Sequence, residues 1–288
     1  MAGLQSSARG RVKRWAKRFR WAHSINRVLN REHLRILEGS PAFAPNSAGS
    51  PRLRADLAIQ AAHQTFPFLW EFLRATGRET LPLVEVQDFE SSEMGTTAAS
   101  RLKVLFDQYG SDKATDHNYH LIYGSILARA DEIQTILEVG LGTNNSDVPS
   151  NMGPDGRPGA SLRAFRDYLP RAQVFGADVD KRVLFAEERI KTFFVDQTDL
   201  ATVDALGRQV PEELDLIIDD GLHAPNANIG ILRLAITKLR VGGWVVIEDI
   251  NSSAIPIWQV VASMMPNSFE CSLINANAGI VFAAQRTA

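Results

Sequence analysis

The sequence predicts an α/β fold built on a doubly wound, mostly parallel sheet of seven strands, and two observations support it. Short apolar runs with the character of buried strands alternate with segments of helical spacing, at 135–141, 173–179, 191–197, 214–220 and 244–250. Two more apolar runs, 270–276 and 279–285, are joined by Asn277 and Ala278 alone. So short a link allows only an antiparallel pair, and the sheet is expected to end in a hairpin.

The segments between these runs are expected to be helices. Ser161 suits the N-cap of a helix over 161–168, and Pro225 suits the first turn of the helix that follows the fourth strand. Another helical stretch is expected at 254–265. In 226–239 the apolar residues that share one helix face are Ile229, Leu232, Ile236 and Leu239, and that face is expected to pack on the sheet.

The first 100 residues differ in character from the rest. Residues 1–40 hold ten Arg/Lys and two Asp/Glu, a sum of +8, so the remainder of a chain with net charge -2 sums to -10. We expect a basic amphipathic helical arm at 1–40, with helical spacing over 11–38, then a linker and a helical cap at 41–100, and the α/β domain at 101–288. The arm either docks on an anionic membrane surface or an acidic partner, or packs on its own acidic body.

Composition narrows the class of protein. The chain has 288 residues, 45% hydrophobic and 22% charged, with no apolar run near the ~20 residues of a membrane span. It shows no secretory signal, and the single cysteine, Cys271, excludes an internal disulfide and a multi-cysteine metal site. We expect a cytoplasmic protein, with peripheral membrane contact and homo-oligomerisation left open. The acidic body disfavours nucleic acid as a partner.

Acidic residues follow the carboxyl ends of four of the five strands, where an open α/β sheet binds its ligands. The first strand ends in Glu138, Gly140 and Gly142, and such glycines let a backbone approach a ligand closely. Asp178, at the end of the second strand, is placed to bind the two hydroxyls of a ribose, with the long loop 144–160 explaining its distance from Gly142. The alternative for Asp178 is an ordinary turn residue.

Two carboxylate pairs, Asp219-Asp220 and Glu248-Asp249, end two strands that we expect to be neighbours. Crowded like charges are stabilised by a cation, and an all-oxygen set suits Mg²⁺, Mn²⁺ or Ca²⁺. Because adjacent residues of a strand point to opposite faces, one member of each pair is expected to face the site. Alternatively, these acids cap helices or pair with Lys and Arg.

Two further motifs lie near these strands. His223 precedes a helix and could take a proton from a substrate hydroxyl near neutral pH. The run Tyr109-Gly110-Ser111-Asp112-Lys113 precedes His117, Tyr119, His120 and Tyr123. It either folds over a cofactor or lines an acceptor pocket, or it is a helix amino terminus with packed aromatic residues.

The runs ILEVGLG, GASLRAFRDYLPRAQVFGADVD, RIKTFFVDQTD, LDLIIDDGLH and LRVGGWVVIEDI together resemble class I methyltransferases, Rossmann-like enzymes that use S-adenosylmethionine (SAM). More narrowly, residues 105–285 are similar to the metal-dependent sugar O-methyltransferases of macrolide biosynthesis and to the cephalosporin-hydroxylase-like group. The resemblance implies that Glu138, Gly140 and Gly142 line the methionine part of SAM. It implies that Asp178 binds the ribose, and that Asp196 and Gln197 lie near the adenine. It also implies that Mg²⁺ is bound by Asp219 or Asp220 together with Glu248 and Asp249. The general base would be His223 or a neighbouring Asp, such as Asp219.

The resulting hypothesis is a SAM-dependent O-methyltransferase that methylates a hydroxyl of a sugar, polyketide or other polyol with the help of Mg²⁺. The alternative is a non-catalytic SAM- or nucleotide-binding interaction protein. An NAD-dependent dehydrogenase is disfavoured by the terminal hairpin and by Asn145, which stands where a full G-x-G-x-x-G motif has its third glycine. Among departures from the methyltransferase pattern, Thr143 stands where many methyltransferases have a third glycine. Leu222 also departs from the serine that is common among near relatives.

Overall fold

The computed structural model describes residues 31–39, 50–89, 92–277 and 279–288. The chain divides into two compact units, Met1–Phe72 and Leu73–Ala288. Helix α2 spans Arg31–Glu38, at the end of the helical spacing predicted over 11–38, and helix α3 spans Pro51–Ala75, within the region predicted to hold a linker and a helical cap. Residues 11–30 of that prediction lie outside the described residues. Of the helices that the structure describes, none has the length and apolar character needed to span a bilayer.

The second unit is built on a single mixed sheet, which in the described residues has nine strands in the order β1-β8-β9-β7-β6-β2-β3-β5-β4. The central neighbours are parallel, and β9 runs antiparallel between β7 and β8, which confirms the mostly parallel sheet with its terminal hairpin. The strands are β1 Leu83–Glu85, β2 Thr135–Val139, β3 Gln173–Asp178, β4 Ala186–Glu187, β5 Ile190–Phe194, β6 Leu214–Asp219, β7 Leu239–Ile250, β8 Phe269–Asn275 and β9 Ile280–Arg286.

The expected count of seven strands was wrong by two edge strands. β1 extends the sheet beyond β8 in parallel, and β4 adds two residues antiparallel to β5. The seven strands between them are those that the apolar runs predicted. Edge strands this short hold too few residues to show a period in the sequence.

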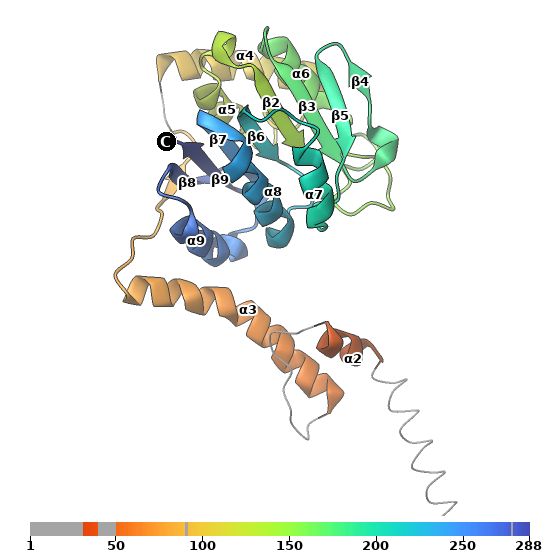
Figure 1. Ribbon diagram of the computed structural model, residues 1–288, viewed down its shortest axis with the longest axis vertical. Coiled ribbons are helices and arrows are strands. Elements are labelled where there is room, and N and C mark those ends of the chain that lie inside the picture. Colours follow the sequence, from red (N-terminus) through yellow and green to blue (C-terminus); the bar gives the residue numbers. More distant parts are fainter. Residues whose placement is uncertain (1–30, 40–49, 90–91, 278) are drawn as a thin grey trace, which may run out of the picture. The chain divides into compact units, whose positions relative to one another are not determined.

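Helices cover both faces of the sheet (Figure 1). On one face lie α4 Glu93–Tyr109, α5 His120–Ile126 and α6 Ala160–Tyr168, where the rings of Phe106, Tyr123 and Phe165 pack edge to face. On the other lie α7 Leu200–Gly207, α8 Pro225–Lys238 and α9 Ile255–Met264, where Trp258 stacks on Phe282. Single-turn 3-10 helices lie at Ala130–Glu132, Lys181–Val183 and Ser252–Ala254. The doubly wound prediction is confirmed.

Two local predictions were wrong. Gly159, not Ser161, is the N-cap of α6, because the Ser161 hydroxyl instead donates a hydrogen bond to Glu138 Oε2 at 2.7 Å. The prediction for helix α8 was wrong at Ile229, which is 38% exposed, while Leu232 and Leu239 of the same face are buried as expected. Apolar residues lie on more than one side of this helix, so periodicity alone could not select the buried side. The fully buried residues of its packed face are Ala227, Ile231 and Ala235.

Candidate active site

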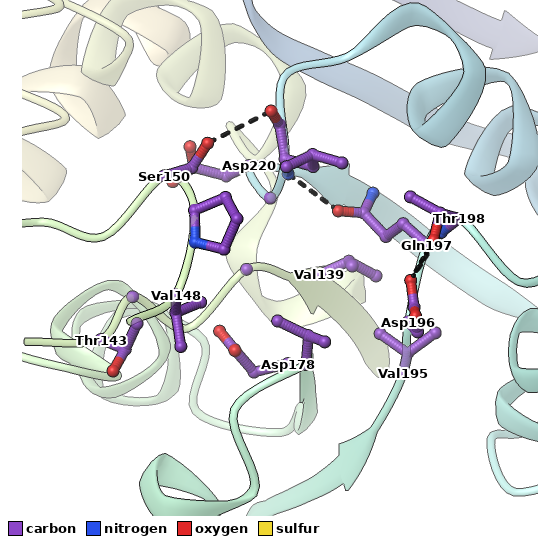
Figure 2. A pocket seen from close by; sticks show the side chains of 16 residues that line it. Val139, Thr143, Val148, Ser150, Asp178, Val195, Asp196, Gln197, Thr198 and Asp220 are labelled. Carbon is purple, nitrogen blue, oxygen red and sulfur yellow. Dashed lines mark hydrogen bonds between the residues drawn. The ribbon is translucent and has the colours of Figure 1, made fainter. Parts of the chain in front are cut away.

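Two adjoining pockets open at the carboxyl ends of the central strands. The β3 pocket, of about 300 Å³, is formed by residues that follow β2, β3, β5 and β6 and by part of the loop 144–160 (Figure 2). The β7 pocket, of about 480 Å³, is formed by residues from β7, the segment after α4 and the rest of that loop. From β2, the strands β3 and β5 are added toward one edge of the sheet, whereas β6 and β7 are added toward the other edge. The switch point of the strand order therefore lies between β2 and β6, where both pockets open. Both pockets are lined by Gly140, Gly142, Ser150 and Asp220.

Gly140 and Gly142 form the wall between the pockets because the backbone there passes very close to other groups. Gly140 has φ +99°, and a Cβ atom on it would lie 2.0 Å from the backbone oxygen of Asp220. Gly142 has φ +78°, and a Cβ there would lie 2.3 Å from the end of the Met152 side chain. A side chain at Gly140 would therefore push apart the loops after β2 and β6, which hold the two pockets together.

Asp178, predicted to bind a ribose, ends β3 and lines the β3 pocket. Its carboxylate accepts hydrogen bonds from the backbone N–H groups of Leu141 and Asp180, both at 2.8 Å, and it points toward Val148 in Figure 2. Burial raises the pKa of this carboxyl, and the backbone hydrogen bonds oppose that rise. The carboxylate is thus fixed in position by neutral donors and keeps lone pairs for a ligand hydroxyl.

Asp196 and Gln197 also line the β3 pocket, as predicted for the residues after β5. The Asp196 carboxylate accepts hydrogen bonds from the N–H and hydroxyl of Thr198. The Gln197 amide joins two strand ends: its Nε2 donates to Asp219 Oδ1 at 2.7 Å, and its Oε1 accepts from the Leu222 N–H at 2.9 Å. Gln197 therefore shapes the pocket wall chiefly by holding the loop after β6.

Asp219 is fully buried and lines neither pocket. Besides the Gln197 amide, its carboxylate accepts a hydrogen bond from Asn228 Nδ2 at 3.0 Å and a longer one, 3.3 Å, from the Gly221 N–H. Burial raises the pKa of this carboxyl, and these amide hydrogen bonds oppose the rise. The structure thus gives Asp219 a supporting position behind Asp220, as the alternation of side chains along a strand requires.

Lys113 is the centre of the acidic side of the site. Its side chain is only 2% exposed. The Lys113 Nζ atom lies 2.7 Å from Asp220 Oδ2 and 3.2 Å from Glu138 Oε1, and it also contacts Glu248 Oε2. Burial lowers the pKa of this ammonium, but the three carboxylates outweigh burial and hold the pKa well above its ordinary value. A permanent positive charge is therefore built in at the ends of β2, β6 and β7, which are adjacent strands.

Asp249 lies at the other end of the β7 pocket, between two histidines. Its Oδ1 is 3.3 Å from His117 Nδ1 and accepts a 2.6 Å hydrogen bond from the Tyr119 hydroxyl, and its Oδ2 is 3.8 Å from His223 Nε2. Burial raises the pKa of the Asp249 carboxyl, but the hydrogen bonds from His117 and Tyr119 outweigh it and bring that pKa down to about 2. Asp249 is therefore ionised at any ordinary pH.

Asp220, His223 and Asp249 together form a group that suits a divalent ion. Each offers one ligand atom, and these atoms all lie within 4.8 Å of one another. Two carboxylate oxygens with an imidazole are compatible with Mg²⁺ or Mn²⁺. Both His223 (φ +56°) and Asp249 (φ +54°) hold left-handed backbone conformations, which are costly for such residues and often occur at functional sites.

The loop 144–160 contributes to both pockets. Val148, Pro149 and Ser150 line the β3 pocket, and the stretch from Ser150 to Arg157 lines the β7 pocket. The Ser150 hydroxyl donates a 3.2 Å hydrogen bond to the backbone oxygen of Leu222, which fixes the middle of the loop to the turn after β6 (Figure 2). The unusual length of this loop therefore supplies pocket wall.

The segment Tyr109–Lys113 also lies at the β7 pocket, but as the end of a helix. Tyr109 is the last residue of α4, and Gly110 forms its left-handed C-cap. The alternative, a helix amino terminus with packed aromatic residues, holds for the later part of the predicted segment, because α5 begins at His120 and Tyr123 packs in the core. Ser111, Asp112 and Lys113 line the pocket, and this position agrees with the interpretation in which the run lines an acceptor pocket.

Comparison with solved structures identifies the fold. The MycE methyltransferase of the mycinamycin biosynthetic pathway, solved in complex with Mg and S-adenosylhomocysteine (SAH), matches with a TM-score of 0.53 and 22% identity, over 65% of this chain and 55% of that one. The fold is that of a SAM-dependent methyltransferase. The Rossmann-like methyltransferase fold expected from the sequence is confirmed.

Curated proteins of similar sequence are sugar O-methyltransferases. The chain is 30% identical over 157 residues to 8-demethyl-8-α-L-rhamnosyl tetracenomycin-C 2′-O-methyltransferase of Streptomyces olivaceus, over 53% of this chain and 38% of that one. It is 37% identical over 99 residues to mycinamicin VI 2″-O-methyltransferase of Micromonospora griseorubida, over 34% and 24%. The chain thus spans between about a quarter and two fifths of these relatives. No family model matches the chain. The expected similarity to macrolide-type sugar O-methyltransferases is confirmed.

The structure divides the site residues predicted from the sequence into three groups. Gly140, Gly142, Asp178, Asp196 and Gln197 line the β3 pocket. Asp220, His223 and Asp249 form the cluster that suits a divalent ion, while Glu138, Asp219 and Glu248 are buried and paired with protein groups. Sequence reasoning missed the roles of Lys113, His117 and Tyr119, although all three lie in the segment singled out upstream.

Proposed function

We propose that this chain carries a SAM-dependent O-methyltransferase domain that methylates a sugar hydroxyl with the help of Mg²⁺. The observation that carries the proposal is the meeting of the two pockets at Gly140, Gly142, Ser150 and Asp220. One pocket has acid and amide groups suited to a nucleoside, and the other has the cluster that suits a divalent ion. A methyl donor and a hydroxyl acceptor bound in them would meet at this shared wall.

The cofactor is proposed to bind in the β3 pocket. Asp178 would accept hydrogen bonds from the ribose hydroxyls, and the side of the pocket at Asp196 and Gln197 would take the adenine. Gly140 and Gly142 would face the methionine part, with Glu138 behind them as a support, since it is fully buried and is absent from both pocket linings. SAM supplies an electrophilic methyl group, and the protein's part is to hold that group against the β7 pocket.

The acceptor is proposed to bind in the β7 pocket. Asp220 and Asp249 would hold the divalent ion, and a bound ion lowers the pKa of an oxygen that it contacts. His223 would accept the proton of the acceptor hydroxyl, because it lies in the same cluster and its Nε2 faces the ionised Asp249. In this proposal Asp219 does not act as ligand or base, and it holds the loop that carries Asp220.

The acceptor class follows from the named relatives, which act on sugar hydroxyls of glycosylated polyketides. A 6-deoxyhexose attached to a polyketide is the proposed acceptor class. For the rest of the chain we propose the division into a basic arm at 1–40, a linker and helical cap at 41–100, and the methyltransferase domain at 101–288. The arm is proposed to contact an acidic partner or a membrane surface.

Calorimetric titration of the full chain with SAH and with NAD tests the cofactor class. We expect SAH to bind and NAD not to bind. Asp178→Ala should weaken SAH binding by about 100-fold, since it removes charge-assisted hydrogen bonds. Asp199→Ala is the matched control, because Asp199 is an exposed acid that caps α7 outside both pockets. Absence of SAH binding in the unmodified chain would refute the proposal.

Turnover separates an enzyme from a non-catalytic binder. Labelled SAM should transfer methyl groups to rhamnosyl polyketide glycosides, with a rate that rises with added Mg²⁺ and falls in Asp249→Asn. SAH binding without methyl transfer to any glycoside of a 6-deoxyhexose panel would favour the non-catalytic alternative.

A further inference from the structure

The Lys113 ammonium lies among three carboxylates: it donates hydrogen bonds to two of them, and it lies 3.2 Å from the third, at Glu138 Oε1. One is Asp220, and the others are Glu138 and Glu248, which are 0% and 1% exposed. An ammonium group has three donors and no acceptor, and here two donors are used in hydrogen bonds to Asp220 and Glu248 while Glu138 adds an ion pair. Lys113 is thus an integral part of the site, even though it comes from the segment between α4 and α5 rather than from the sheet.

The second oxygen of each buried carboxylate is also taken. Glu138 Oε2 accepts a hydrogen bond from the Ser161 hydroxyl at 2.7 Å, and Glu248 Oε1 accepts one from the Tyr123 hydroxyl. Tyr123 is itself fully buried. Glu248 therefore has a cation on one oxygen and a hydroxyl on the other, and little is left for a metal ion.

Asp220 and Asp249 have a different arrangement. Lys113 contacts only Oδ2 of Asp220, whose side chain is 26% exposed. Asp249 is 24% exposed and has no contact with Lys113 in the described structure. These two carboxylates, with His223 beside them, remain directed toward the β7 pocket.

We propose that Lys113 is a fixed internal cation that reserves Glu248 and confines the divalent ion to Asp220 and Asp249, and so limits how tightly the site binds metal. Two effects act together. The ammonium repels a second cation bound to the same Asp220 carboxylate, and it withholds a further carboxylate that would otherwise be a ligand. A weakly held ion suits a site whose ion must also accept and release substrate oxygens.

The inference rests on the proposed divalent ion in the β7 pocket, and Mn²⁺ alone is the probe. We would measure Mn²⁺ binding to the full chain by calorimetry and by the electron spin resonance signal of free Mn²⁺, without SAM or acceptor. Lys113→Met keeps the side-chain length and removes the charge, and it should bind Mn²⁺ at least about tenfold more tightly. Lys103→Met is the matched control, because Lys103 pairs with Asp107 on the exposed side of α4 and should change affinity less than about twofold.

Glu248→Gln gives an independent result that does not depend on the folding of Lys113→Met. It keeps Lys113 and removes a negative charge that Lys113 largely neutralises, so Mn²⁺ affinity should fall by less than about tenfold. Asp249→Asn should weaken it by about 100-fold. Loss of Mn²⁺ binding in Glu248→Gln would overturn the inference, and so would unchanged or weaker binding in a folded Lys113→Met.

These outcomes separate the inference from the proposed function. Mn²⁺ binding by the unmodified chain with the same affinity in Lys113→Met overturns the inference and leaves the proposed metal site intact. Binding that appears only in Lys113→Met supports the inference in its strongest form. Absence of Mn²⁺ binding in both overturns the inference together with the metal-assisted part of the proposed function.

Discussion

The two pockets balance the charges of their acids in opposite ways. In the β3 pocket Asp178 is held by backbone N–H groups, and Asp219, which lines neither pocket, is held by side-chain amides. At the β7 pocket Glu138, Asp220 and Glu248 share the ammonium of Lys113. Neutral donors orient a carboxylate without cancelling its charge, whereas a buried cation cancels part of it. Neutral donors, as at Asp178, suit a site for a ligand with hydroxyl groups. A buried cation, as at Lys113, suits a site that binds one metal ion and not several.

The shared wall offers the strongest way to disturb both pockets at once. Gly140→Ala places a Cβ 2.0 Å from the backbone oxygen of Asp220 at a residue with φ +99°, so the loops after β2 and β6 must separate. We expect a loss of about 3 kcal/mol or more in the free energy of unfolding, measured by urea denaturation, with both SAH and Mn²⁺ binding impaired.

Gly153→Ala is the matched control for that experiment. Gly153 also has a positive φ, +73°, but a Cβ there meets nothing within 4 Å. It should cost only about 1 kcal/mol, the backbone penalty alone. Equal losses in the two variants would contradict the role given to the close approach at Gly140.

Reciprocal variants test whether the pockets act separately. Asp178→Ala should weaken SAH binding by about 100-fold and leave Mn²⁺ affinity within about threefold, and Asp249→Asn should do the reverse. Both affinities are measured by calorimetry on the same preparations. Parallel losses of both ligands in either variant would show that the division between the pockets is wrong.

The histidines give a smaller effect whose sign depends on pH. The hydrogen bond to Asp249, aided by its charge, raises the pKa of His117 above its ordinary value despite partial burial. Stability from this pair is fully present below about pH 6.5 and is lost as pH rises through the higher pKa of the folded state. His117→Gln in metal-free buffer should therefore cost about 1 kcal/mol at pH 5.5 and little at pH 8.5, measured by urea denaturation.

His120 provides the opposite case. Burial, with a smaller contribution from Lys103, lowers its pKa, so its protonation opposes folding as pH falls. His120→Gln should gain stability relative to the unmodified chain at low pH. The same pH trend in both variants would contradict this assignment.

The smallest expected effect concerns Thr143, which stands where many methyltransferases have a third glycine. Its hydroxyl donates to Asp180 Oδ2 at 2.7 Å and accepts a hydrogen bond from the Asn145 N–H. Thr143→Val keeps the shape and should lower Tm by about 3 °C. SAH affinity should change less than about threefold, because the hydroxyl faces Asp180 rather than the pocket. A larger loss of SAH binding would give Thr143 a direct role in the β3 pocket.

The sheet could be predicted from the sequence because its central strands β2, β3, β6 and β7 are mostly buried and form continuous apolar runs. The positions of Asp178, Asp220, His223 and Asp249 at one end of the sheet follow from the same pattern, since parallel strands all end on the same side. The edge strands β1 and β4 could not be predicted, because two or three residues show no period.

The partners of the acids could not be predicted. Lys113 meets Asp220 and Glu248 across 107 and 135 residues of sequence, and nothing local to a loop lysine indicates such contacts. Strand alternation correctly predicted that the two acids of each pair lie in different surroundings. It could not predict which acid lies in which, because two neighbouring acids carry the same kind of side chain. The choice between Glu248 and Asp249 as a ligand depends on Tyr123 and Lys113, which come from other elements.

The loop 144–160 divides between the pockets at Ser150, which is tied to Leu222, and this division has a practical consequence for directed evolution. Residues after Ser150, such as Met152 and Arg157, contribute to the β7 pocket without lining the β3 pocket. Libraries restricted to 151–157 can therefore search for new acceptors while the cofactor contacts stay unchanged. Changes at Val148 and Pro149, before Ser150, would instead alter the β3 pocket.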